Sequence, residues 1–179
     1  MLGATGGVGL AAVQIARLMG ARVLAAGGSD AKLARIAGEA DAVVNYDTQD
    51  LRAAIATFTD GRGINVVYDA VGDRYSEPAL RSTAWRGRFL IVGFAAGKIP
   101  RLPANLLLLK GCEAVGVFYG DYLRREPEQG RAEFQRLLSW FASGRLIVPI
   151  DRIYRLHEAA IALRNLADRK LVGKAVLVP

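Results

Sequence analysis

Histidine and cysteine are almost missing from this chain of 179 residues, which contains one of each, His157 and Cys112. A single cysteine excludes a disulfide within the chain and a zinc site built on cysteines. Because no histidine stands near Cys112 in the sequence, we interpret this residue as a small core side chain and not as a reactive thiol. His157 opens a predicted helix, where a surface position is the simplest interpretation. The sequence therefore shows no metal-ligand cluster and no pair of a nucleophile with a base.

Long apolar runs and clusters of charge are missing as well. The longest apolar stretches, at 64–68 and 106–109, are far too short to cross a bilayer. No charged-then-apolar leader opens the chain, so we expect a cytoplasmic protein without a membrane partner. The net charge of +7 comes from scattered Lys and Arg residues, with no basic run and no aromatic-interleaved patch. A solvated basic surface that helps to attract an anionic cofactor is the expected use of this charge, and nucleic acid is not an expected partner.

The chain contains instead a regular alternation of predicted strands and helices, in a composition that is 52% apolar. After the short apolar entry at the N-terminus, strands are predicted at 21–26, 42–45, 64–69, 88–94 and 115–118. Helices are predicted between them at 8–19, 30–37, 50–57 and 76–84. Such alternation with short loops predicts right-handed βαβ units and an α/β fold, a Rossmann-type doubly wound parallel sheet. The continuous apolar run at 64–69 is typical of a strand covered on both faces.

The pattern changes after residue 121. Residues 123–129 are charged and include a proline, and an amphipathic helix is predicted at 132–143. A short strand at 152–154, a helix at 157–167 and a terminal strand at 174–178 follow. Because this tail does not continue the alternation cleanly, we divide the chain into a nucleotide-binding domain at 1–123 and a C-terminal segment at 124–179 that belongs to another unit.

The main functional signal lies in the first nine residues. A short apolar entry leads into a turn of the form Ala4-x-Gly6-x-x-Gly9, and a helix follows at once. Gly6 lets the backbone approach phosphates, and Gly9 lets the helix pack closely on the strand. The start of the helix offers unpaired N–H groups and the positive end of its dipole. Ala4 stands where the usual fingerprint has its first glycine, so a merely sharp connection is the alternative interpretation.

A second sequence feature that indicates nucleotide binding lies about twenty residues later. In NAD-specific sites a carboxylate at this position binds the adenosine ribose. Here Gly27 and Gly28 are followed by Ser29 and, three residues further on, by Lys32. A hydroxyl and an ammonium would bind a 2′-phosphate that a carboxylate would repel, so NADP is favoured over NAD. Asp30 leaves two alternatives open: it could be a displaced ribose ligand, or it could only cap the helix together with Ser29.

With these residues in place, the chain resembles the cofactor-binding half of the medium-chain dehydrogenase/reductase superfamily. More narrowly, it resembles the zinc-independent NADPH:quinone oxidoreductases of the zeta-crystallin type. The resemblance covers essentially the whole chain and rests on five stretches that occur in the family's order. They are GATGGVGLAAVQIA at 3–16, VNY at 44–46, VVYDAVG at 66–72, GRFLIVGFA at 87–95 and LVGKAVL at 171–177.

The resemblance implies a set of cofactor-binding residues. These are Gly6, Gly7 and Val8 at the pyrophosphate; Ser29, Lys32 and Tyr46 around the 2′-phosphate; Ala70 and Val71 along the ribose; and Gly93, Phe94, Ala95 and Phe118 near the nicotinamide. In relatives the sixth strand, which carries Phe118, also pairs with the same strand of a second subunit, so a homodimer is expected. The aromatic residues have a structural alternative, in which Tyr46 covers a strand end and Phe94 and Phe118 belong to the core.

The resemblance also implies an NADPH-dependent reductase of quinones or other α,β-unsaturated carbonyl compounds. We assign no catalytic residue, because the cofactor carries the chemistry. The family has a GroES-like catalytic domain ahead of the glycine turn, and the segment at 124–179 resembles the part that returns to it, so we expect the isolated chain to be inactive. An enoyl-thioester reductase of the same superfamily and a non-catalytic module that binds NADPH or RNA are the alternatives. In a third, the shortened first strand leaves the chain unable to bind a cofactor.

Overall fold

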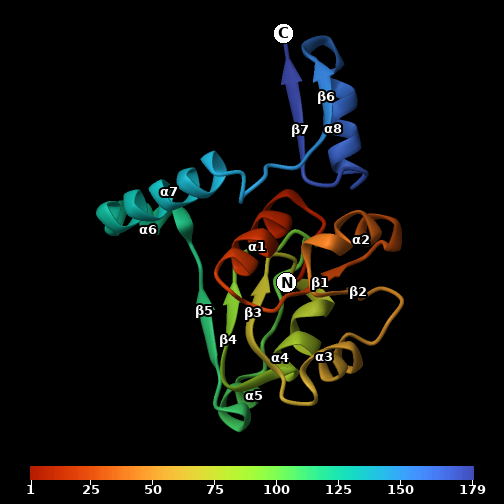
Figure 1. Cartoon of the computed structure of the whole chain (residues 1–179). Helices are drawn as coiled ribbons and strands as arrows, with labels where there is room; N and C mark the ends of the chain where they lie inside the picture. The colour runs from red at the N-terminus through yellow and green to blue at the C-terminus, as the bar shows by residue number, and fades with distance from the viewer.

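The N-terminal stub, Met1 and Leu2, lies at the centre of a parallel sheet in the computed structural model, which describes residues 1–179. Leu2 bridges Ala26 on one side and Asp69 on the other, so it joins two halves of the sheet. The strand order is β2–β1–stub–β3–β4–β5, with all pairs parallel. The strands are β1 (Leu24–Gly27), β2 (Ala42–Asn45), β3 (Ile64–Asp69), β4 (Thr83–Ile91) and β5 (Glu113–Gly116). The predicted α/β fold is confirmed (Figure 1).

Helices lie on both faces of this sheet and enclose two apolar cores. The helices are α1 (Gly7–Leu18), α2 (Asp30–Ile36), α3 (Leu51–Thr59), α4 (Ser76–Arg81) and α5 (Ala104–Lys110). One core lies between the sheet and α3, α4 and α5, and Phe89 and Leu80 are fully buried in it. The other lies between the sheet and α1 and α2, around Val13 and Leu33. Successive residues of β1 alternate between the two cores, as expected for a strand with both faces covered.

β3 does not have both faces covered, so that expectation was wrong. Val67 is buried against α3 and α4, whereas its neighbour Val66 is 43% exposed on the opposite face. The reason lies in the connections. α1 follows the stub and α2 follows β1, and together they cover only the β1–β2 half of one face of the sheet. α4 and α5, which follow β3 and β4, lie on the opposite face.

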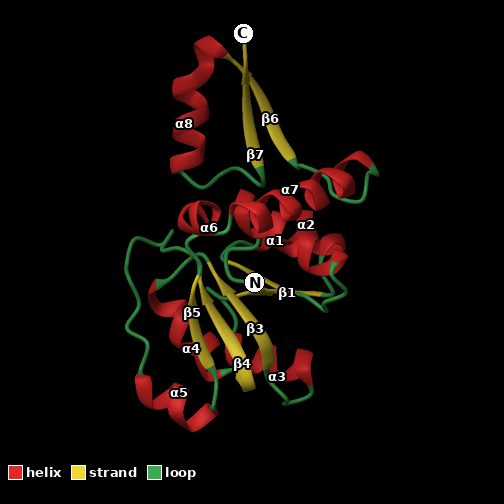
Figure 2. Cartoon of the chain, turned by 90° about the vertical axis from the view of Figure 1, so that its left-hand side faces the viewer, coloured by secondary structure: helices red, strands yellow, loops and turns green.

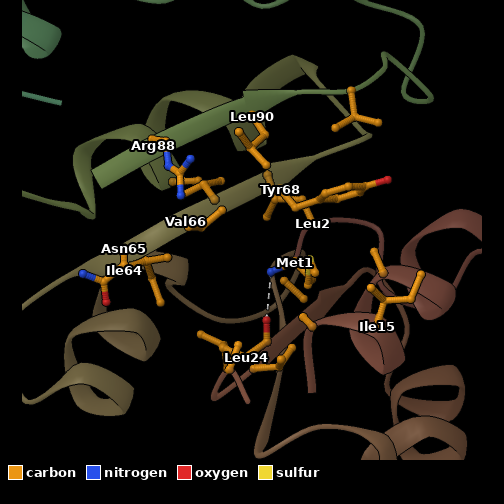
Figure 3. A pocket seen from close by; sticks show the side chains of 18 of the residues that line it. Met1, Leu2, Ile15, Leu24, Ile64, Asn65, Val66, Tyr68, Arg88 and Leu90 are labelled. Atoms are coloured by element: carbon orange, nitrogen blue, oxygen red, sulfur yellow. Dashed lines mark hydrogen bonds between the residues drawn. The ribbon is translucent and has the colours of Figure 1, made fainter. Parts of the chain in front are cut away.

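A largely apolar cavity of about 1520 Å³ opens where this cover is missing. Its lining includes Ile15 of α1, Val66 of β3 and Leu90 of β4, with Met1 at its floor (Figure 3). Leu2 pairs with Asp69, the last residue of β3, and only one residue precedes Leu2, whereas five residues of β3 precede Asp69. Along these first residues of β3, the cavity lies between β3 and β1. The Met1 amine is buried there and donates a hydrogen bond to the Leu24 carbonyl at 3.0 Å. Burial lowers the pKa of this amine from 8.0 to about 6.

Several predicted boundaries were wrong in the second half of the sheet. The strand expected at 115–118 is β5 (Glu113–Gly116), because the left-handed Gly111 ends α5 and returns the chain to the sheet two residues early. The apolar run at 106–109 belongs to α5, which the sequence analysis did not assign. The strand expected at 88–94 is β4 (Thr83–Ile91), whose first residue already pairs with Ile64 of β3. The helix expected at 76–84 therefore stops at Arg81.

The tail forms three α-helices and a separate small sheet. Its elements are α6 (Tyr119–Arg125), α7 (Pro127–Ala142), β6 (Ile150–Arg155), a short 3-10 turn at Leu156–Glu158, α8 (Ala159–Ala167) and β7 (Lys174–Val178). β6 and β7 pair in parallel apart from the main sheet, with α8 beside them (Figure 2). Tyr154 of β6 is buried, and its hydroxyl accepts a hydrogen bond from the side-chain amide of Asn165 in α8. Leu163 and Leu166 of α8 stay exposed, at 65% and 60%.

Three smaller expectations can be compared with the structure. Cys112 is buried in the core beside α5, as predicted. His157 is exposed, as predicted for a residue at the start of the last helical segment. None of the helices is both long enough and apolar enough to cross a membrane.

Candidate functional site

The glycine turn forms an open cradle at the start of α1. Gly3 has a left-handed backbone (φ 71°), and Gly6 is the extended residue that caps the helix. A Cβ on Gly9 would lie 2.1 Å from the Gly3 carbonyl oxygen, so only glycine lets the helix pack on the turn. By contrast, nothing lies closer than 3.5 Å to the position of a Cβ on Gly6. The two glycines therefore have the different roles that the sequence predicts for them.

Backbone N–H groups without a hydrogen-bond partner line the opening of this cradle. The backbone N–H groups of Gly7, Val8 and Gly9 make no hydrogen bond within the chain, and the first turn of α1 has no acidic residue. The Lys174 side chain of β7 lies over the turn, with carbons 3.1 and 3.2 Å from the position of a Cβ on Gly7. Free N–H groups at a helix start, together with a nearby ammonium, fit a diphosphate. Lys174 belongs to a stretch that carries the resemblance, but the sequence analysis gave it no role.

The carboxyl ends of β1 and β2 bring together the residues expected around a 2′-phosphate. Ser29 precedes α2, and its hydroxyl makes no capping bond, so capping does not occupy it. The Asp30 carboxylate accepts a hydrogen bond from the amide of the buried Asn45 at 3.0 Å, which ties it to β2. Tyr46 follows β2, and its ring lies 4.0 Å from that of Tyr75, centroid to centroid. Burial raises the pKa of the Tyr46 hydroxyl to about 12.

Two cations without a carboxylate partner lie beside these residues. The Lys32 ammonium donates to the backbone carbonyls of Arg169 and Leu171, the latter at 3.1 Å. Desolvation lowers the pKa of Lys32, and the charge of Asp151 opposes this shift. Arg169 has a left-handed backbone (φ 55°), and its carbonyl is one of the two acceptors of the Lys32 ammonium. Neither Lys32 nor Arg169 forms an ion pair.

Sequence reasoning missed Arg169, although it lies only two residues before the stretch at 171–177. It also missed Asp47, whose carboxylate oxygen Oδ2 lies 2.5 Å from the position of a Cβ on Gly28. The other oxygen, Oδ1, accepts hydrogen bonds from Tyr75 at 2.6 Å and from Arg74 at 2.7 Å. Asp47 looked like an ordinary surface acid, and its partners come from a turn 27 and 28 residues away.

The turn after β3 is held by a buried carboxylate. Asp69 accepts hydrogen bonds from the N–H groups of Val71 and Gly72 at 2.9 and 2.8 Å, and from the Ser76 hydroxyl at 2.5 Å. Val71 then packs against the glycine turn, because its Cγ2 lies 2.7 Å from the position of a Cβ on Gly3. The structure thus brings Ala70 and Val71, the expected ribose contacts, next to the predicted pyrophosphate site.

The segment expected near the nicotinamide is partly occupied by its own backbone bonds. The N–H groups of Gly93 and Ala95 donate to the carbonyls of Asp69 and Ala70, and only that of Phe94 stays free. Phe118 lies beyond the end of β5, not on the strand as predicted, because it caps α6. It is 75% exposed and Phe94 is 40% exposed, so neither is a core residue. Phe118 lines the same cavity as Gly7 and Val8.

This arrangement of strand, glycine turn and helix agrees with what comparison with known proteins shows. Residues 7–143 match a family described as zinc-binding dehydrogenase. The chain belongs to this family. It forms the cofactor-binding half of a medium-chain dehydrogenase/reductase. The family's description names zinc, but no three His, Cys, Asp or Glu side chains of this half come together in a way that could hold a metal ion.

Three relatives illustrate the range of the superfamily. A quinone oxidoreductase-like protein 2 of Bos taurus is 38% identical over 97% of this dehydrogenase half and 50% of its own length. The Escherichia coli quinone oxidoreductase in complex with NADPH superposes with a TM-score of 0.85, at 29% identity, over 99% of this chain and 55% of that one. A phthiocerol polyketide synthase subunit of Mycobacterium tuberculosis is 33% identical over 97% of this chain and 8% of its own length. The chain spans about half the length of the quinone oxidoreductase-like relatives.

Proposed function

We propose that this chain is the NADPH-binding part of a zinc-independent reductase that acts on quinones or other α,β-unsaturated carbonyl compounds. The observation that carries the proposal is the pairing of an open glycine cradle, with unpaired N–H groups, and two cations without carboxylate partners at the ends of β1 and β2. The Escherichia coli relative was crystallised with NADPH, which supports the same cofactor here. When bound, the nicotinamide supplies the hydride.

The residues of the chain position the cofactor and select it. The N–H groups of Gly7 and Val8 would hold the pyrophosphate at the positive end of α1, with Lys174 adding a charge. Lys32 and Arg169 would bind the 2′-phosphate, with Ser29 and Tyr46 donating hydroxyl hydrogen bonds. A site for NADH needs an acceptor for the 2′-hydroxyl, and it gains nothing from these two cations. The expected preference for NADPH therefore rests on the positive charges of Lys32 and Arg169, in the corner at the ends of β1 and β2.

At the other end, Ala70 and Val71 would lie along the ribose. Backbone groups of Gly93, Phe94 and Ala95 would face the nicotinamide, where the N–H of Phe94 is free and those of Gly93 and Ala95 are bonded to the carbonyls of Asp69 and Ala70. Phe118 would shield the ring. Positioning the ring and excluding water are the contributions we assign to this half.

We propose further that residues 1–123 are the nucleotide-binding domain and that residues 124–179 return to a GroES-like catalytic domain. Two open apolar surfaces support this division: the cavity beside β3 and β4, and the exposed face of α8. A homodimer through β5, which pairs on one side only, and a cytoplasmic location remain predictions. On its own the chain would bind cofactor without turning it over.

An enoyl-thioester reductase is the second candidate, favoured by the match to the polyketide synthase subunit. The two candidates share the cofactor site and differ in the substrate. A chimera that joins this chain to the remaining half of the Escherichia coli enzyme would test turnover, using NADPH with 1,4-benzoquinone, an enone and a crotonyl thioester. Binding of NADPH without turnover of any of the three would support the non-catalytic module instead.

The cofactor assignment is tested first on the chain itself. We expect NADPH to quench or shift the protein fluorescence at lower concentration than NADH does. Lys32→Gln should reduce this preference at least tenfold, since a charge-assisted bond to the phosphate is lost. Lys110→Gln, a charge change in α5 far from the site, is the matched control. Failure of the wild-type chain to bind either cofactor would overturn the proposal.

A further inference from the structure

An acidic side chain lies inside the corner that we assign to the 2′-phosphate. Asp47 directly follows Tyr46, and its Oδ2 points toward Gly28, the residue before Ser29. This oxygen accepts no hydrogen bond within the chain, whereas Oδ1 accepts two. A carboxylate at this place is the feature that favours NADH and repels a 2′-phosphate. The corner therefore contains a charge that opposes its own proposed cofactor.

A cation from another part of the fold offsets that charge. Arg74 belongs to the 3-10 turn Asp73–Tyr75 after β3, and its guanidinium donates to Asp47 Oδ1 at 2.7 Å. The same guanidinium donates to the Tyr75 hydroxyl at 3.0 Å, and that hydroxyl donates to the same oxygen at 2.6 Å. These three side chains form a closed triangle of hydrogen bonds at the rim of the corner.

The backbone and the aromatic rings hold the triangle in place. Asp73 has a left-handed backbone (φ 56°), directly after the left-handed Gly72, and its N–H donates to the Lys98 carbonyl. The Tyr75 ring packs against Tyr46 at an interplanar angle of 39°, and the Arg74 guanidinium lies 5.0 Å from the centroid of the Tyr75 ring. Arg74 thus contacts both Tyr75 and Asp47, although 69% of its side chain stays exposed.

We propose that Arg74 is a specificity-determining positioning residue, which makes the corner accept the 2′-phosphate of NADPH by neutralising Asp47. The inference rests on the proposed function of this corner. Arg74 acts through Asp47 and does not itself contact the phosphate. The Tyr75 hydroxyl, and secondly Arg74, hold the pKa of Asp47 below its usual range, so the carboxylate stays charged and needs this partner.

The expected effect of removing Arg74 is a change in cofactor preference. Without it, the uncompensated carboxylate would repel the 2′-phosphate a few ångströms away, and NADPH affinity should fall on the order of tenfold. NADH affinity should stay within about twofold, because the 2′-hydroxyl carries no charge to repel. Tyr75→Phe should shift the preference in the same direction by a smaller factor, since it removes one of the two donors to Oδ1.

A double-mutant cycle on the whole chain distinguishes this role from direct phosphate binding. Dissociation constants of NADPH, NADH, 2′,5′-ADP and 5′-AMP are measured for the wild type, Arg74→Gln, Asp47→Asn and the double variant. We expect Arg74→Gln to weaken NADPH and 2′,5′-ADP only, and to have no effect once Asp47→Asn is present. A loss of the same size in both backgrounds would show that Arg74 contacts the phosphate and would overturn the inference.

Arg81→Gln is the matched control, because Arg81 carries the same charge nearby but pairs with Glu77. It should leave the ratio of NADPH to NADH affinity unchanged, and thermal melts would confirm that all variants are folded. If the wild type prefers NADPH but Arg74→Gln keeps that preference, the inference fails and the proposed function stands. If the wild type binds neither cofactor, the proposed function itself fails.

Discussion

In the β1–β2 half of the main sheet, the strand β1 is covered on both faces, whereas β3 in the other half is covered on one. Four consecutive residues of β1 are buried, but Val66 of β3 is 43% exposed. The cradle and the two unpaired cations lie on or beside the covered half, where packing fixes their positions. The other half leaves apolar side chains in an open cavity. A doubly wound sheet thus forms its glycine cradle between its own strands and helices, but leaves one quadrant of its surface uncovered.

The largest expected effect contrasts the two faces of β4. Phe89 is fully buried between the sheet and α4, so Phe89→Ala should reduce the free energy of unfolding by about 4 kcal/mol. Its neighbour Leu90 faces the open cavity, and Leu90→Ala should cost only about 1 kcal/mol. Urea denaturation followed by circular dichroism measures both. Equal losses would show that the open face is covered in solution.

The second-largest effect is expected from a substitution at the tight contact between α1 and the glycine turn. Gly9→Ala places a methyl group 2.1 Å from the Gly3 carbonyl oxygen, which forces α1 away from the turn. We expect a loss of about 3 kcal/mol in stability, together with loss of NADPH binding. Gly38→Ala is the control, because nothing lies within 4 Å of its Cβ position. Wild-type stability in the Gly9 variant would contradict the packing described above.

The junction of the two halves should make the 179-residue chain sensitive to pH. The Met1 amine has a pKa of about 6 in the fold and 8.0 as its ordinary value, so the unfolded chain binds the proton more readily. Stability should therefore fall as the pH drops from about 9 to about 5, most steeply between pH 8 and pH 6, by roughly 2.7 kcal/mol in total for two pKa units. Acetylation of the amine removes the titrating group, and the acetylated chain should lose this component. The same pH dependence in both forms would rule out the amine as its source.

The smallest effect concerns the open quadrant alone. Val66→Asp should cost at most about 1 kcal/mol, because the side chain is already half exposed, and it should reduce the fluorescence of a bound apolar dye such as ANS. Val67→Asp, one residue along β3, places a charge in the opposite core and should prevent folding. Dye fluorescence that does not respond to Val66→Asp would mean that the dye binds elsewhere.

The sequence predicted best the bounds of three short strands. The predicted bounds at 42–45, 64–69 and 174–178 agree with β2, β3 and β7, because each is a short apolar run between polar or glycine residues. It missed α5, since an apolar run of four residues fits a strand or a helix equally well, and Leu108 and Leu109 turn out to be exposed. That error moved the next strand by two residues.

At the candidate site, local signals identified the glycine turn, and resemblance supplied most of the other residues. Asp47, Arg74 and Arg169 escaped because their meaning depends on partners from distant segments. Arg74 gains its place only when the turn after β3 meets the end of β2. Arg169 gains its place only when the tail returns to α2. No window of sequence contains both members of either pair.

The contact between Lys32 and the tail makes the nucleotide corner a long-range assembly. The carbonyl partners of Lys32, at Arg169 and Leu171, follow it by 137 and 139 residues and lie in the segment that we assign to another unit. A chain cut after residue 123 would keep its glycine cradle, but Lys32 would lose both of these acceptors. Selection for the phosphorylated cofactor thus depends on two segments that lie far apart in the sequence.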